Sequence, residues 1–124
     1  MLLAVAESQG IESEFLPKIA TGFCSGLART GGPCGALMGA VMALNLLTGR
    51  SEAGAPVDRN YALVNELIDQ FEAKFGSTNC KELTGVDLGT EEGRAQFREK
   101  GQLANCLDQA EEATRLVLDL AEGE

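Results

Sequence analysis

The spacing of hydrophobic residues predicts helices along most of the chain. Apolar residues recur at intervals of three and four in several segments, and no useful length alternates with a period of two. We therefore expect an all-α fold, with one compact domain over residues 1–124 and about five to seven helices. The helices expected from these patterns and from glycine stops are, in chain order, 1–8, 12–21, 33–48, 58–75, 79–83, 90–100 and 106–121.

The segment 33–48 is the most apolar of these helices and is rich in small residues. Gly35, Gly39 and Ala43 repeat every four residues along it. Such a stripe lets another backbone approach closely, although each glycine costs a helix about 1 kcal/mol relative to alanine. We expect this Gly/Ala-rich helix to be buried at the centre of the domain. We also expect a homodimer, with the helices 1–8 and 33–48 contributing to its interface.

Charge is distributed unevenly and limits the classes of partner. The net charge is −9; residues 1–50 hold three acids and three bases, whereas 51–124 hold sixteen acids and seven bases. An acidic surface argues against nucleic acids and anionic membranes as partners. The apolar run from Cys34 to Leu47 is shorter than the roughly 20 residues needed to span a bilayer, so we expect no membrane insertion. No basic segment precedes the apolar start, and we expect a cytoplasmic protein.

Four cysteines and the lack of histidine decide which chemistry is plausible. Without histidine there can be no Ser-His-Asp or Cys-His arrangement. Disulfides are rare in most cytosols, so four cysteines there indicate redox or metal chemistry. Three of them, Cys34, Cys80 and Cys106, fall where helices are expected to begin. The partial positive charge of a helix N-terminus should lower the pKa of these thiols from about 8.5.

Cys34 is the expected attacking thiolate, because it combines a proline-led helix start with Arg29 nearby in the sequence. The partner cysteine is expected to be Cys80 or Cys106, and Cys24 lies at the end of the helix 12–21. No Cys-x-x-Cys pair exists, so the fold has to bring these residues together. If it does, the same four cysteines could instead bind an iron–sulfur cluster or a zinc ion.

The cysteine segments also resemble a known family. Residues 34–39 read CGALMG and match a CGAxxG motif, residues 75–85 read FGSTNCKELTG, and a late cysteine, Cys106, follows. The chain resembles the C_GCAxxG_C_C family of redox-active proteins over about residues 10–120. Cys34, Cys80 and Cys106 match that pattern well. Some relatives place their first cysteine further upstream, so either Cys24 substitutes for it or the site is a variant.

The resemblance implies a redox-active protein that uses clustered cysteines for thiol–disulfide or electron-transfer chemistry. Two alternatives remain at this point. One is a cysteinate metal- or iron–sulfur-binding protein without turnover. The other is a structural interaction module associated with a transporter, because genes of the family often lie near transporter genes.

Overall fold

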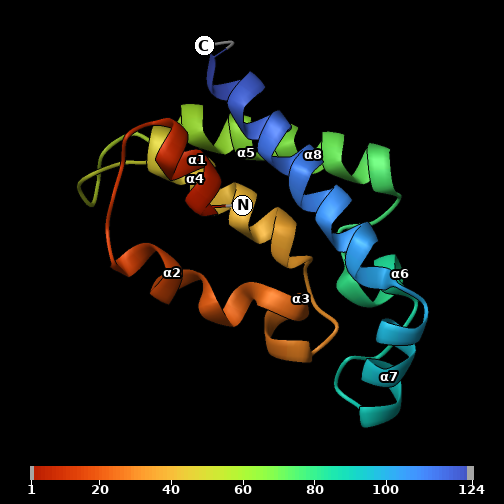
Figure 1. The fold of residues 1–124 in the computed structure, drawn as a ribbon. Helices are drawn as coiled ribbons and strands as arrows, with labels where there is room; N and C mark the ends of the chain where they lie inside the picture. The colour runs from red at the N-terminus through yellow and green to blue at the C-terminus, as the bar shows by residue number, and fades with distance from the viewer. Residues whose placement is uncertain (1, 123–124) are drawn as a thin grey trace.

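The computed structural model describes residues 2–122, which form helices and no strand, so the all-α prediction is confirmed (Figure 1). No helix among these residues is long and apolar enough to cross a membrane. The elements are α1 (Leu2–Ser8), α2 (Phe15–Ala20), the 3₁₀ turn η1 (Thr21–Phe23), α3 (Cys24–Arg29), α4 (Gly35–Thr48), α5 (Asp58–Phe75), α6 (Cys80–Thr84), α7 (Glu91–Glu99) and α8 (Gln102–Glu122).

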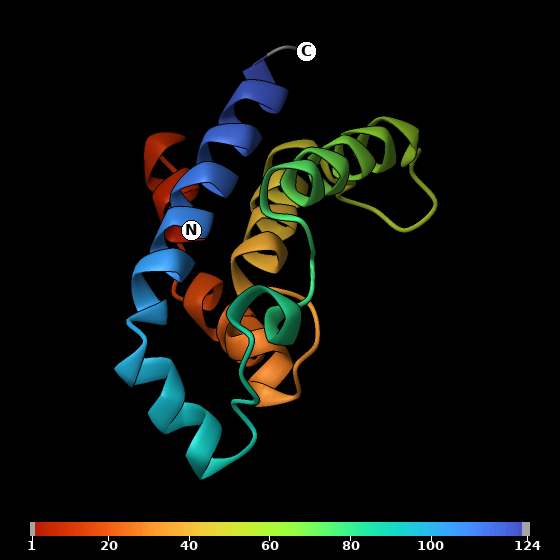
Figure 2. The same cartoon turned by 90° about the vertical axis from the view of Figure 1, so that its right-hand side faces the viewer.

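Helix α4 is the element against which the others pack. It contacts α1, α3, α5 and α8, and these helices surround it in Figures 1 and 2. The residues that α4 buries are Leu37, Gly39, Ala40, Ala43 and Leu44. Small residues at the contacts let the neighbouring helices approach α4 closely, while each buried leucine contributes about 1.5–3 kcal/mol to stability. The facing helices complete this core with Val5, Leu63, Leu67, Phe71, Ala113, Leu116 and Val117.

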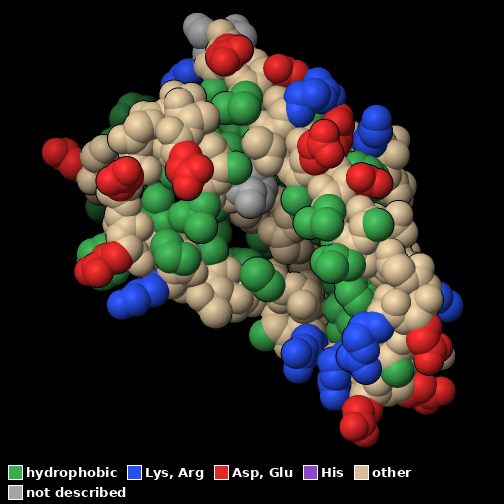
Figure 3. Space-filling model, in the orientation of Figure 1, with side chains coloured by type: hydrophobic (Ala, Val, Ile, Leu, Met, Phe, Trp, Pro, Cys, Tyr) green, Lys and Arg blue, Asp and Glu red, His purple; other side chains and the backbone are tan. Residues whose placement is uncertain are grey.

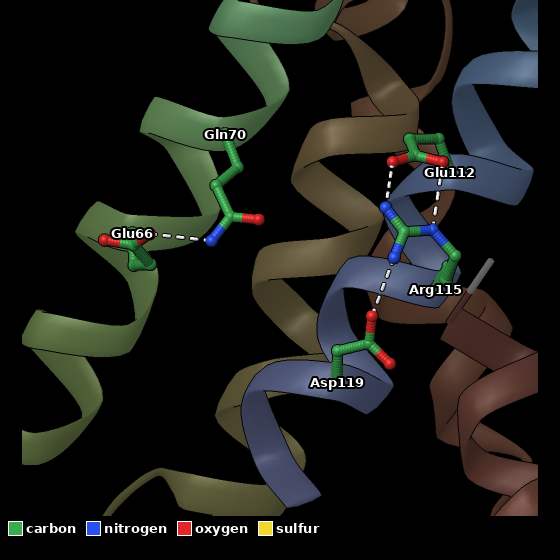
Figure 4. Close-up of polar contacts among 5 residues, drawn as sticks. All are labelled: Glu66, Gln70, Glu112, Arg115 and Asp119. Atoms are coloured by element: carbon green, nitrogen blue, oxygen red, sulfur yellow. Dashed lines mark hydrogen bonds and ion pairs between the residues drawn. The ribbon is translucent and has the colours of Figure 1, made fainter. Parts of the chain in front are cut away.

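Polar and charged side chains pair on the exposed faces of α5 and α8, in keeping with the acidic second half of the chain. Arg115 donates hydrogen bonds to both Glu112 and Asp119 on α8, and Gln70 donates to Glu66 on α5 (Figure 4). The Arg115 hydrogen bond lowers the pKa of the Glu112 carboxyl. Exposed pairs of this kind contribute at most about 1 kcal/mol, so the fold depends mainly on the apolar contacts of α4.

Three helices, α2, α4 and α8, differ by two residues or more from the sequence prediction at their N-terminal ends. Helix α8 begins at Gln102, four residues before the predicted start, because Gly101 with φ +64° ends the preceding turn. Asn105 therefore lies inside α8 and donates to the Gln102 side chain instead of capping the helix. Helix α2 begins at Phe15, which is exposed, as is Ile19.

The homodimer expected from the sequence stays a prediction.

The glycine-rich segment between α2 and α4, where the sequence predicts no helix, contains the short element α3. Its residues Ser25, Gly26, Leu27 and Ala28 all have left-handed backbone angles, with φ between 53° and 65°. A non-glycine residue in this region costs about 1–2 kcal/mol. The carbonyl of Gly26 accepts hydrogen bonds from the Gly32 N–H and the Thr30 hydroxyl, both at 3.0 Å, which helps to hold this turn.

The first residue of α4, Gly35, packs directly on the backbone that precedes α3. A Cβ atom built on Gly35 would lie 3.0 Å from the carbonyl oxygen of Phe23 and 3.1 Å from the Cα of Cys24. Both contacts are to backbone atoms, which cannot rotate away as a side chain could. The motif glycine therefore permits the close approach of α4 to the start of α3.

We predict that Gly35→Ala lowers the free energy of unfolding by about 1 kcal/mol, because overpacking outweighs the better helix propensity of alanine. Urea unfolding followed by circular dichroism measures this change. Gly22→Ala is the matched control: Gly22 lies on the neighbouring turn η1, its φ is not positive, and a Cβ there would meet nothing within 4 Å. Equal stabilities of the two variants would contradict the prediction.

Candidate functional site

All four cysteines line one cavity of about 430 Å³. It is lined by residues of α3, the start of α4, α6, α7 and the first half of α8, and Figure 2 shows these segments towards the end of the molecule away from the C-terminus. Its walls are otherwise mostly apolar or small. The remaining lining residues are Ser25, Gly26, Gly35, Ala36, Leu83, Thr84, Leu88, Phe97, Leu103, Gln109 and Ala110.

A single antiparallel β-bridge between Pro33 and Asn79 joins the two segments that carry Cys34 and Cys80. The Cys34 N–H donates to the carbonyl of Thr78 at 2.7 Å, and the Cys80 N–H donates to the carbonyl of Gly32 at 2.8 Å. Each of these cysteines therefore directly follows a bridge residue. The bridge fixes the two cysteines relative to each other although they are far apart in the sequence.

Two features next to this bridge place Cys80 close to α3: the cap of α6 and the contact with Gly26. The Asn79 side chain accepts hydrogen bonds from the N–H groups of Lys81 and Glu82 and so begins α6 at Cys80. On the other side of the contact, a Cβ atom on Gly26 would lie 2.5 Å from the Cβ of Cys80. Only a residue without a side chain fits at position 26, and this brings Cys80 against the turn that follows Cys24.

The four cysteines are free thiols in different environments. Cys34 and Cys80 are buried, Cys106 is partly buried and Cys24 is exposed. Cys34 is the cap residue before α4 and not an internal helical residue, because its backbone is extended with φ −58° and ψ 130°. Cys106 lies in the second turn of α8, so the expected helix-start position is wrong for this residue.

The predicted lowering of the thiol pKa is also wrong for two of the cysteines. Burial raises the pKa of Cys80, and the nearby Cys34 and Cys106 thiols raise it further. Burial raises the pKa of Cys106 as well, with a further contribution from Cys34. Loss of solvent and mutual repulsion of thiolates disfavour the charged form, so these two residues are held as thiols at neutral pH.

Gln109 is a site residue that the sequence did not indicate. Its side chain is only 5% exposed, and its Oε1 accepts a hydrogen bond from the Sγ of Cys34 at 3.6 Å. From the sequence, a single glutamine in an amphipathic helix is expected to be an ordinary exposed residue. The one signal is its spacing, since Gln109 follows Cys106 by three residues and so shares its helix face.

Two other predictions about the site concern the charge of Arg29 and the binding of a metal ion. Arg29 is exposed and is not among the described residues that line the cavity. Within residues 2–122, no three His, Cys, Asp or Glu side chains are grouped closely enough to hold a metal ion. Metal binding by Cys24, Cys34, Cys80 and Cys106 stays a prediction.

Comparison with known proteins places the chain in a family. A family model described as "Putative redox-active protein (C_GCAxxG_C_C)" matches residues 1–120. The chain belongs to this family. No curated protein and no solved structure matches the chain significantly. In this C_GCAxxG_C_C protein the motif cysteine Cys34 lines the cavity. The motif glycine Gly35 makes the close contact with the segment that carries Cys24.

We predict that Cys80 and Cys106 reach half-maximal alkylation at a pH above the roughly 8.5 of a free thiol, because burial disfavours their thiolates. Iodoacetamide labelling over a range of pH, followed by trypsin and mass spectrometry, measures each residue separately. Each cysteine lies in its own tryptic peptide; these peptides are 19–29, 30–50, 75–81 and 101–115.

The variant Cys34→Ser tests the electrostatic part of this account. It removes a charge that raises the pKa of both other cysteines, so both labelling curves should move to lower pH. They should not reach the free-thiol value, because burial is the larger cause and remains. Curves that do not move in the variant would show that Cys34 does not interact with the other two thiols.

Proposed function

We propose that this protein carries out thiol–disulfide redox chemistry at the four-cysteine cavity, with Cys34 as the attacking residue and Cys80 or Cys106 as its partner. The observation that carries the proposal is the convergence of all four cysteines, from separate parts of the chain, on one cavity. A thiol that has formed a mixed disulfide needs a second thiol nearby to release it. The reducing cytoplasm that we infer for the protein would keep all four thiols free between reactions.

Two features support Cys34 in the attacking role. The Gln109 amide positions its sulfur, and its charge acts on both Cys80 and Cys106, so either of these thiols is near enough to serve as its partner. The bridge also favours Cys80 as partner, because both residues adjoin the same pair of backbone hydrogen bonds. Cys106 remains a second choice, since its thiol is close enough to Cys34 for their charges to interact.

Metal binding receives less support from the site. A structural zinc or an iron–sulfur cluster needs three or four thiolates directed at one point. The cysteines of residues 2–122 surround a cavity without forming such a group. Thiol exchange needs only two sulfurs at a time.

The proposal predicts an intramolecular disulfide that links the peptide 30–50 to either 75–81 or 101–115. The reduced protein is treated with a mild oxidant at low concentration, blocked with iodoacetamide, digested with trypsin and mapped under non-reducing conditions. Cys34→Ser should abolish this disulfide, whereas Cys24→Ser, which changes only the exposed cysteine, should leave it.

Two results would contradict the proposal. One is oxidation that gives only disulfides between molecules, or none that includes the peptide 30–50. The other is stoichiometric iron or zinc in protein purified without oxygen, measured by elemental analysis, because the thiols would then be metal ligands. In either case the cavity would require a different explanation.

A further inference from the structure

The wall of the cysteine cavity carries no charge. Among the described residues that line it, none is Asp, Glu, Lys or Arg, and the polar groups other than the thiols are those of Ser25, Thr84 and Gln109. Arg94 lies on α7 beside the wall, but its Nη1 donates to the Leu88 carbonyl at 2.9 Å and the residue does not line the cavity. A charged molecule that entered would lose water without gaining an opposite charge.

The remaining lining is suited to apolar groups of modest size. Leu83, Leu88, Phe97 and Leu103 contribute the larger side chains, and the volume of about 430 Å³ is in the range of small-molecule sites. The hydrophobic character continues outside the cavity, because hydrophobic side chains are exposed along α8 on the face shown in Figure 3. The charged groups of glutathione would find no oppositely charged side chain among the described residues that line the cavity.

We propose that the substrate of this site is a small, uncharged, largely apolar disulfide. The inference rests on the proposed thiol–disulfide function and adds the class of molecule that the cavity accepts. A disulfide suits an uncharged wall better than a hydroperoxide does. Its leaving group is a thiolate, the conjugate base of an acid of pKa about 8.5, whereas an alkoxide or hydroxide leaving group would need a charged or strongly donating residue to stabilise it.

The exchange balances without another reactant. Cys34 loses a proton and its sulfur attacks one sulfur of R–S–S–R; the substrate S–S bond breaks, a Cys34–S–S–R bond forms, and RS⁻ leaves and takes the proton. The partner thiol then loses its proton and attacks the Cys34 sulfur. The mixed disulfide breaks, a protein disulfide forms, and the second RS⁻ leaves as RSH. Two protein thiols are oxidised by two electrons, and one substrate disulfide is reduced to two thiols.

Two aromatic disulfides built on the same rings test the effect of charge. 2,2′-Dithiodipyridine is neutral at pH 7, whereas 6,6′-dithiodinicotinate is the same disulfide with a carboxylate on each ring. The rate of each with the full-length reduced protein is followed at the peptide 30–50 by quenching and mass spectrometry, which separates Cys34 from the exposed Cys24. Each rate is divided by that of the same probe with a small free thiol. We expect the normalised rate to favour the neutral probe by about tenfold or more, because the uncharged wall cannot replace the water around a carboxylate.

Two substitutions on α8 provide a matched pair. Leu103 and Leu107 are 59% and 60% exposed and one helical turn apart, but only Leu103 lines the cavity. Leu103→Arg places a cation at the wall and should reduce the preference for the neutral probe by about fivefold, as expected of a partly exposed charge. Leu107→Arg adds the same charge outside the cavity and should leave the preference unchanged. Both positions are exposed enough to accept arginine without unfolding.

The outcomes separate this inference from the proposed function. Normalised rates that are equal, or faster for the charged probe, would overturn the proposed substrate class. If an intramolecular disulfide forms in those same samples, the proposed thiol–disulfide function is still supported. A preference that changes equally in Leu103→Arg and Leu107→Arg would also overturn it, because the cavity wall would not be the cause. If neither probe yields an intramolecular protein disulfide, the proposed function fails and the substrate class fails with it.

Discussion

The site depends on one backbone contact, the bridge between Pro33 and Asn79. Two hydrogen bonds hold the bridge, and each is donated by a cysteine that follows a bridge residue, Cys34 at 2.7 Å and Cys80 at 2.8 Å. Main-chain hydrogen bonds inside a protein are short-range and directional, so they fix position more firmly than packing alone. Without this contact the start of α6 would have no fixed position relative to the start of α4.

Glycine is required on both sides of this contact. Gly35 lets α4 approach the backbone of the segment that carries Cys24, and Gly26 lets the Cys80 side chain lie against α3. The buried small residues Gly39, Ala40 and Ala43 extend the same property into the core, where α8 packs on α4. Helix α8 brings Cys106 to the cavity. Small residues in α4 therefore serve the core and the site together.

The sequence was sufficient to predict most of the helices and to name the four cysteines. Helix α5 has the predicted bounds because a stripe of Leu63, Leu67 and Phe71 precedes Gly76, which adopts a left-handed conformation that few other residues accept. The start of α8 was missed because Asn105 is a favourable capping residue, and local propensity gives no reason to prefer Gln102. The left-handed turn of α3 depends on contacts with Gly32 and Cys80, so no local pattern indicates it.

The environment of the thiols was harder to predict than their identity. A helix start lowers the pKa of a thiol only where that thiol also keeps solvent, and burial opposes it. Cys80 begins the short helix α6 as expected, yet burial raises its pKa. The bridge that brings Cys80 to the cavity also removes it from water, and neither effect can be inferred without the contact between residues 33 and 79.

These electrostatics are compatible with exchange of neutral molecules. Charges at Cys34 and Cys106 both raise the pKa of Cys80, so a thiolate at either position disfavours a second thiolate at Cys80. Thiol exchange needs one thiolate at a time: one sulfur attacks, and the second stays protonated until the mixed disulfide has formed. A cavity with a cation would instead favour several thiolates, which is the condition for binding a metal. The uncharged wall and the raised pKa values thus have the same chemical consequence, namely a site that works with neutral partners and holds little net charge at any step.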